Sequence, residues 1–271
     1  MKKYDYSKEQ ELFHDISPKI LQFIKTASRK IAVQKPNSFS KVEYATVADI
    51  EVEKIIVKEI NKHFPADKIV AEETSPKIPE NYEGRYWLID PICGTTNFSR
   101  GANLFATNIA LAENGHLIAA CVIDHNEKKY IWSIKDNKIF MDNKVIPSFQ
   151  PEQPSIIDFE FSTVSAMNTK EKEKHLNLVR KILQETQYYI SSYATSLAFT
   201  YTALGKIDAY IVPNARVWDI AAPNFLVLQA GGKISDINGK EWTLHSNNVI
   251  GARDKNLHKE IINFLNDPIR N

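Results

Sequence analysis

The 271-residue sequence has few cysteines and no excess of one charge. Its two cysteines, Cys93 and Cys121, are too few for a disulfide framework in a chain of this length, which favours a reducing, cytoplasmic location. Lysine and arginine number 34 against 33 aspartate and glutamate residues, a net charge of +1. We therefore expect neither a nucleic-acid polymer nor an anionic membrane surface as a partner.

Long apolar runs are also missing. No window approaches the roughly 18 uninterrupted apolar residues of a transmembrane helix, so we expect no membrane span. Residues 1–16 begin with the lysine pair Lys2 and Lys3 but have no continuous apolar segment behind it, which is unlike a signal peptide. The sequence shows no repeats or low-complexity segments. With 43% hydrophobic and 25% charged residues, it is typical of a globular protein with a sizeable core.

Apolar periodicity predicts two helices at the start of the chain. Between Leu12 and Ile31 apolar residues recur at steps of three and four, which predicts one long helix. Pro36 and several turn formers follow it. A second apolar stripe predicts a helix between Asp49 and Pro65.

From Lys68 the period changes to that of strands. "KIVAEE" and "RYWLID" are predicted strands that each end in a carboxylate, and residues 105–142 are predicted to form antiparallel strands. The expected turns are Glu113–Gly115, Asn126–Lys128 and Asp136–Asn137. Three prolines in "IPSFQPEQPS" mark the best internal boundary, which divides the chain into an α+β half (1–150) and an α/β half (151–271).

Strands and helices alternate in the second half. The predicted strands are "SIIDFEFST", "YYISSY", "IDAYIVP" and "NVIGAR". The predicted helices are "KEKEKHLNLVRKILQE", "TSLAFTYTALG", "DIAAPNFLVLQAGG" and "NLHKEIINFLN". The layout is therefore α+β followed by α/β.

Carboxylates stand at the ends of several predicted strands: Glu72 and Glu73, Asp90, and Asp219 after "RVW". Such positions can present ligands to a cleft, and magnesium takes one or two carboxylates together with water and substrate phosphate. Each acid also has a purely structural explanation. The glutamate pair could be a solvated turn, Asp90 the start of a turn, and Asp219 a helix N-cap.

Two short motifs add to the carboxylates. Asp49 lies three residues after Thr46 at a predicted helix start, which resembles a capping box. Gly94 allows the backbone to approach a ligand closely. If Thr95 and Thr96 open a short helix, their N–H groups form an anion site suited to phosphate.

The order of these motifs is more specific than any one of them. T-x-x-D, E-E, "DPICGTTNF" and "VWDIAAPNFLVLQAGG" follow one another from Thr46 to Gly232. In this the sequence resembles the inositol monophosphatase family. These are lithium-sensitive, magnesium-dependent phosphatases that include nucleotide bisphosphate phosphatases and relatives of fructose-1,6-bisphosphatase. The resemblance implies a layered α-β-α-β-α sandwich.

The resemblance also implies roles for individual residues. It assigns to the activating metal the Glu72 carboxylate and the Ile92 backbone carbonyl. Asp90 is implied to be shared by two metals and Asp219 to belong to the second metal site and the substrate site. Thr95 orients the attacking water and donates a hydrogen bond to Asp49. The substrate phosphate is held at Gly94, Thr95 and Thr96, and the implied cofactor is Mg²⁺ at two or more sites.

The sequence departs from the family pattern at several positions. Cys93 stands where the family has a second metal-binding aspartate, and a thiol is a poor magnesium ligand. Cys93 is a doubtful metal ligand, a small packed residue or a reactive thiol, whereas Cys121 lies in the apolar run "LIAACVI" and is expected in the core. Val212 replaces a glutamate that grips inositol hydroxyls, and Arg216 nearby could face an anionic substrate. Gln229 replaces the glutamate of the usual E-A-G-G.

The function that follows is hydrolysis of a phosphate monoester by metal-activated water. The expected substrate is a small phosphorylated metabolite: an inositol, polyol or sugar phosphate, or a nucleotide bisphosphate. The alternative is a catalytically weak or inactive relative that binds a phosphorylated ligand, because Cys93 replaces a metal-binding aspartate. The family resemblance also suggests a homodimer.

Overall fold

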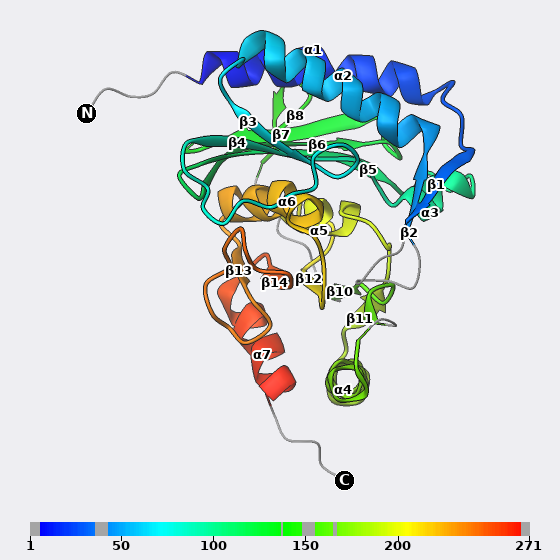
Figure 1. Cartoon of the computed structure of the whole chain (residues 1–271). Helices are drawn as coiled ribbons and strands as arrows, with labels where there is room; N and C mark the ends of the chain where they lie inside the picture. Colours follow the sequence, from blue (N-terminus) through cyan, green and yellow to red (C-terminus); the bar gives the residue numbers. More distant parts are fainter. Residues whose placement is uncertain (1–5, 36–42, 137, 148–154, 165–166, 267–271) are drawn as a thin grey trace.

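A computed structural model of the chain shows helices and sheets in five alternating layers (Figure 1). It describes residues 6–35, 43–136, 138–147, 155–164 and 167–266. Helices α1 (Ser7–Ile24) and α2 (Val47–His63) cover a seven-stranded sheet. Helices α5 (Leu197–Ala203) and α6 (Val217–Gln229) separate this sheet from a five-stranded one. The outer layer holds α4 (Thr169–Glu185) and α7 (Lys255–Asn266), so the predicted α-β-α-β-α sandwich is confirmed.

The seven-stranded sheet has the order β3-β4-β5-β6-β7-β8-β9. Only β3 and β4 run parallel; each later neighbour is antiparallel. The strand bounds are β3 Lys68–Ala71, β4 Arg85–Cys93, β5 Ala106–Glu113, β6 His116–Asp124, β7 Lys129–Ile134, β8 Phe140–Met141 and β9 Lys144–Val145. The predicted turns at 113–115 and 126–128 connect these strands, and Asn137 of the third turn lies outside the described residues.

Beyond Arg85, strand β4 is almost entirely apolar because helices cover both faces of its sheet. Trp87 and Ile89 pack into the cluster beneath α1 and α2. Tyr86 and Leu88 point the opposite way, into the cluster formed with α5 and α6. The polar exception is Asp90, which is 1% exposed. A lone carboxylate at the end of such a strand indicates a site rather than packing.

The five-stranded sheet has the order β11-β10-β12-β14-β13. Strand β10 runs parallel to β11 and β12, and β14 runs antiparallel to β12 and β13. The bounds are β10 Ile156–Phe159, β11 Tyr189–Ser191, β12 Ala209–Val212, β13 Lys233–Ser235 and β14 Val249–Ala252. Helices α4 (Thr169–Glu185) and α7 (Lys255–Asn266) pack against its outer face through a separate apolar cluster.

The long helix predicted for Leu12–Ile31 is wrong beyond Ile24. Helix α1 ends there, and Ile31 begins the strand β1 (Ile31–Lys35) with 46% of its surface exposed. Strand β1 pairs antiparallel with β2 (Glu43–Thr46), which leads directly into α2. The pairing of β1 with β2, which follows it after residues 36–42, therefore overrides the helical spacing of the apolar residues up to Ile31.

The predicted division at residue 150 falls where the structure gives little detail, because residues 148–154 lie outside the described part. The two sheets are built on either side of that segment. Helix α6, from the second half, packs against strands of the first sheet and joins a cluster that contains residues of both sheets. The two-half division stays a prediction. Among the described residues no helix is long and apolar enough to cross a membrane.

Candidate active site

A β-bulge at the end of β4 shapes the first part of the site. Asp90 pairs with Asn108 and Cys93 with Ala106, so two residues of β4 face the single Thr107. The Thr107 hydroxyl donates a hydrogen bond to the Pro91 carbonyl at 2.7 Å and lies 3.0 Å from His125 Nε2. Since its one proton goes to the carbonyl, His125 donates through Nε2. Burial lowers the pKa of His125 to about 3, which keeps this ring neutral.

Gly94 makes the turn from β4 into a short helix. Its φ is +99°, in the left-handed region, and a Cβ there would lie 3.1 Å from the Leu104 carbonyl oxygen and 3.2 Å from Thr195 Cβ. Only glycine satisfies both constraints. Helix α3 (Thr95–Ser99) begins immediately afterwards, as predicted if Thr95 and Thr96 open a helix.

Thr95 and Asp49 form a hydrogen-bonded pair beside the bulge. Thr95 Oγ1 lies 3.0 Å from Asp49 Oδ1 and 2.9 Å from the Ile92 carbonyl oxygen, so its single proton serves one acceptor at a time. Asp49 Oδ2 accepts bonds from the backbone N–H of Thr46 (2.7 Å) and its hydroxyl (2.5 Å). The predicted capping box is confirmed. Complete burial raises the pKa of Asp49, while the Thr46 bonds oppose the rise.

Three carboxylates converge in front of this pair. One oxygen each of Glu72, Asp90 and Asp219 lies within 4.8 Å of the other two. Asp90 Oδ1 is buried and has no hydrogen-bond partner. Burial first, and then the charge of Asp219, raises the pKa of Asp90 well above its usual value. A buried carboxylate oxygen without a hydrogen bond is costly unless a cation neutralises it, so these hard oxygen donors fit a divalent metal.

Asp219 is held by the start of α6, although not as an N-cap. Arg216 occupies the N-cap position, and Asp219, three residues later, accepts a hydrogen bond from the Arg216 N–H at 2.9 Å. The N-cap explanation of Asp219 is therefore wrong, because the carboxylate reaches back from inside the first turn. Asn108 also donates from its side-chain amide to the Asp219 carbonyl at 3.2 Å.

Glu53 is a supporting residue that the sequence did not reveal. It is completely buried on α2, and its carboxylate accepts bonds from the N–H groups of Glu73 and Thr74, each at 2.8 Å. These bonds fix the turn that carries Glu72. The only sign of this role in the sequence is a glutamate beside the buried stripe of α2. The partners of Glu53 lie about 20 residues further along the chain, so spacing does not reveal them.

Cys93 lies in the wall of the same cavity. Its sulfur accepts a bond from the Ser196 N–H at 3.2 Å, and its carbonyl accepts one from the Thr195 hydroxyl at 2.8 Å. The sulfur is not one of the three clustered ligand atoms. Burial, followed by the charges of Asp90 and Asp219, raises the pKa of the thiol well above its usual value. A thiol that stays protonated argues against the reactive-cysteine alternative.

One cavity of about 350 Å³ brings the predicted residues together. Asp49 stands behind Thr95, and the remaining predicted residues line the cavity: Glu72, Asp90, Ile92, Cys93, Gly94, Thr95, Thr96, Arg216 and Asp219. Their individual roles stay predictions. The wall also includes residues that the motifs did not single out: Glu160, Ser162, Thr163, Asn214 and the apolar Phe199 and Ala215, beside Val212.

A second buried acid, Asp158, lies on β10 next to Glu160. Its Oδ1 accepts bonds from the Ser191 hydroxyl (2.9 Å) and the Tyr193 N–H (3.1 Å), whereas its Oδ2 is buried without a partner. Burial raises its pKa from 3.8 to about 7, and the charge of Glu160 adds to the rise. Between about pH 4 and pH 7 the folded chain therefore keeps the Asp158 proton, whereas the unfolded chain has already released it.

This proton makes the free energy of unfolding fall as the pH rises from about 4 to about 7. At pH 8, Asp158→Asn should stabilise the protein by up to about 4 kcal/mol, because the amide keeps the Oδ1 acceptor without a buried charge. Urea unfolding at pH 5 and pH 8 measures the effect. The same loss of stability between these pH values in both proteins would contradict the assignment.

The sandwich fold with clustered carboxylates beside a threonine–aspartate pair is typical of metal-dependent phosphatases. The profile described as the inositol monophosphatase family matches residues 7–269. The chain belongs to this family.

Curated relatives carry two kinds of name. A Thermotoga maritima protein named fructose-1,6-bisphosphatase/inositol-1-monophosphatase is 29% identical over 88% of this chain and 87% of its own. A Pasteurella multocida protein named Nus factor SuhB is 25% identical over 82% of both chains. Among solved structures, a Thermotoga maritima IMPase superposes with a TM-score of 0.79 at 23% identity, covering 95% of this chain and 96% of its own, which supports the fold.

Proposed function

We propose that the protein hydrolyses a phosphate monoester of a small metabolite by metal-activated water. The observation that carries this proposal is the buried, unpartnered Asp90 Oδ1 within the cluster of Glu72, Asp90 and Asp219. Thr95 lines the same cavity, and Asp49 is hydrogen-bonded to Thr95. Groups for binding a cation and for placing a water therefore lie together. The family membership agrees with this chemistry.

Glu72, Asp90 and the Ile92 carbonyl oxygen would hold the activating cation, and Asp90 and Asp219 would belong to a second cation site. The proposed ion is Mg²⁺, because each donor is a hard oxygen. When bound, it lowers the pKa of a coordinated water and offsets charge on the phosphoryl group. If the Ile92 carbonyl binds the cation, the Thr95 hydroxyl would donate its proton to Asp49. The lone pairs of Thr95 Oγ1 then accept a hydrogen bond from the attacking water and aim it at phosphorus.

The same cavity would receive the leaving group. Arg216 lines it and can face an anionic substituent, and the backbone at Gly94, Thr95 and Thr96 is proposed to hold the phosphate. Val212 is apolar and 1% exposed, so it cannot bind sugar hydroxyls. We therefore propose a sugar, polyol or nucleotide phosphate whose binding needs no hydrogen bond from a hydroxyl group to the side chain at position 212.

A weakly active or inactive phosphate-binding relative is the second candidate. It is favoured by the position of the Cys93 sulfur, which offers no ionised oxygen beside Asp90 and Asp219. Some curated relatives are named Nus factor SuhB, so the expected absence of a nucleic-acid partner stays a prediction. A cytoplasmic location and a homodimer remain proposals from composition and from the family resemblance.

An assay panel distinguishes the two candidates. Purified protein is tested against inositol, sugar and polyol monophosphates and nucleotide bisphosphates with Mg²⁺, Mn²⁺ or Zn²⁺. We expect metal-dependent phosphate release from at least one substrate class. No release from any substrate, together with saturable binding of the same compounds in calorimetry, would replace the hydrolase proposal with the binding alternative.

Thr95 provides a direct test of the water-placing pair. Thr95→Ala should lower kcat by about a hundredfold, because the hydroxyl that links Asp49 to the water is lost. Thr95→Ser keeps that hydroxyl and should retain most of the activity. Steady-state kinetics with Mg²⁺ measure both variants. Equal kcat values for the alanine and serine variants would contradict the proposed role.

A further inference from the structure

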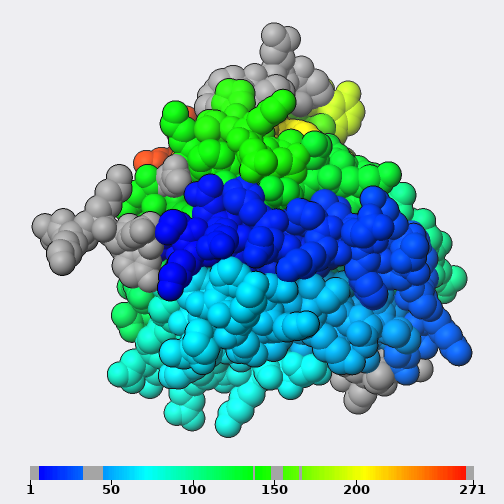
Figure 2. All heavy atoms as spheres, turned by 90° about the horizontal axis from the view of Figure 1, so that it is seen from above, coloured from blue at the N-terminus to red at the C-terminus, as the bar shows by residue number. Residues whose placement is uncertain are grey.

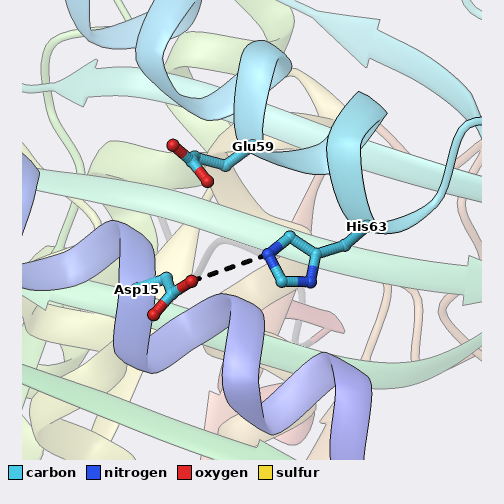
Figure 3. Close-up of side chains that lie close together, drawn as sticks. All are labelled: Asp15, Glu59 and His63. Carbon is cyan, nitrogen blue, oxygen red and sulfur yellow. Dashed lines mark ion pairs between the residues drawn. The ribbon is translucent and has the colours of Figure 1, made fainter.

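A second group of potential metal ligands lies between α1 and α2, on the outer face of the seven-stranded sheet. Figure 2 shows the two helices side by side across this face. Asp15 projects from α1, and Glu59 and His63 project from α2 (Figure 3). One ligand atom of each lies within 4.8 Å of the other two. Glu59 and His63 are four residues apart, so they share one face of the helix.

Two atoms of this group are buried without a hydrogen bond. Glu59 is only 9% exposed, and its Oε2 has no hydrogen-bond partner. His63 Nε2 is equally shielded and lies 3.6 Å from Asp15 Oδ2, beyond normal hydrogen-bond distance. Buried polar atoms without a hydrogen bond cost free energy, and a shared cation would satisfy both atoms.

Two lysines approach Glu59 without filling this gap. Lys19 Nζ contacts the other carboxylate oxygen, Oε1, at 2.8 Å. Lys62 Nζ stays 3.6 Å from Oε2, and its side chain is 64% exposed, so it can turn into solvent. The hydrogen bond from Lys19 lowers the pKa of Glu59, which keeps the carboxylate ionised at neutral pH.

We propose that Asp15, Glu59 and His63 bind a divalent transition-metal ion of the Zn²⁺ class that joins α1 to α2. Two carboxylate oxygens and one imidazole nitrogen suit such an ion, whereas Mg²⁺ prefers oxygen donors alone. Water completes the coordination. The site differs from the carboxylate cluster of the cavity both in its ligands and in its place in the fold.

The position of this site on α2 gives it a structural consequence. Asp49 lies in the first turn of α2, and Glu59 follows ten residues later, about 15 Å along the helix axis. Glu53, which holds the turn carrying Glu72, lies between them. A metal at the far end of α2 therefore fixes the helix that supports the cavity, while it stays too distant to touch a substrate there.

Zinc titration of the full-length protein tests the proposal. Wild type, His63→Gln and Asp15→Asn are compared by calorimetry, each also combined with Asp90→Asn to weaken ion binding in the cavity. We expect each ligand substitution to remove one zinc equivalent or to weaken zinc binding at least about a hundredfold. Even the substitution of residues that only support metal ligands lowers metal affinity by about tenfold to a hundredfold. His116→Gln, which alters an exposed histidine on β6, is the matched control and should bind as wild type does.

Thermal unfolding gives a second measurement. A zinc concentration about a hundredfold above Kd should raise the Tm of wild type by about 5 °C, and this rise should vanish in His63→Gln and Asp15→Asn. Circular dichroism without zinc establishes that the variants fold. Unchanged zinc stoichiometry, affinity and Tm shift in both variants would overturn the proposal. Neither measurement depends on phosphatase activity, so the two proposals fail separately.

Discussion

Asp90→Asn is expected to lower metal-dependent turnover by at least about a thousandfold. An amide has no charge to neutralise a cation, and Asp90 Oδ1 is the deepest unpartnered ligand atom of the cluster. The side-chain volume hardly changes, so the loss is chemical rather than steric. Steady-state kinetics with saturating Mg²⁺ measure it.

The same substitution should stabilise the metal-free protein by about 2 kcal/mol. Asp90 is 1% exposed, its Oδ1 has no hydrogen bond, and burial followed by the charge of Asp219 raises its pKa, so folding without metal buries a carboxylate at a net cost in free energy. Chemical unfolding in the presence of a chelator measures the gain. A variant that loses turnover but gains stability identifies a carboxylate that binds a ligand, whereas loss of a carboxylate that supports the fold would lower stability.

Asp158→Asn is the matched control for this comparison. Asp158 is also a buried carboxylate with an unpartnered oxygen, but it does not line the cavity. Its substitution should stabilise the protein and leave turnover nearly unchanged. Full activity of Asp90→Asn, or an equal loss of activity in both variants, would contradict the assignment of Asp90.

One part of the predicted site depends on local spacing, whereas the place of Glu72, Arg216 and Asp219 in it followed from the family resemblance. Asp90 to Thr96 follow one another in the chain, so a strand end, a bulge and a helix start necessarily bring them together. The Thr46–Asp49 capping box closes over one helical turn. Such short-range geometry is set by the chain itself, which explains why these motifs also carry the family resemblance.

The missed parts depend on contacts between distant segments. Ser196 donates to the Cys93 sulfur from 103 positions away, and Glu53 holds a turn 20 residues beyond it. Strand β13 is only three residues long, too short to show a period of its own. The end of α1 was misplaced because the pairing of β1 with β2 leaves no trace in the helical spacing. Tertiary packing decides these features.

Cys93→Asp is expected to raise Mg²⁺-dependent turnover by at least about tenfold. The Cys93 side chain offers sulfur instead of a hard oxygen, and burial followed by the charges of Asp90 and Asp219 raises the pKa of the thiol, so it stays protonated. A carboxylate there would complete the donors beside Asp90 and Asp219 on the leaving-group side, and a single Lewis-acid contact is worth several kcal/mol. The Ser196 N–H, now 3.2 Å from the sulfur, can donate to the new carboxylate.

Charge, rather than shape, should account for this gain. Cys93→Asn has nearly the same size as Cys93→Asp and should stay at the wild-type level. A fourth acid in the cluster should also lower the Tm of the metal-free protein, and Mg²⁺ should restore it, because the added repulsion disappears when a cation is bound. Kinetics and thermal unfolding with and without Mg²⁺ separate the effects. Equal turnover in wild type and both variants would show that the thiol does not limit the reaction, and that Asp90 and Asp219 suffice on the leaving-group side.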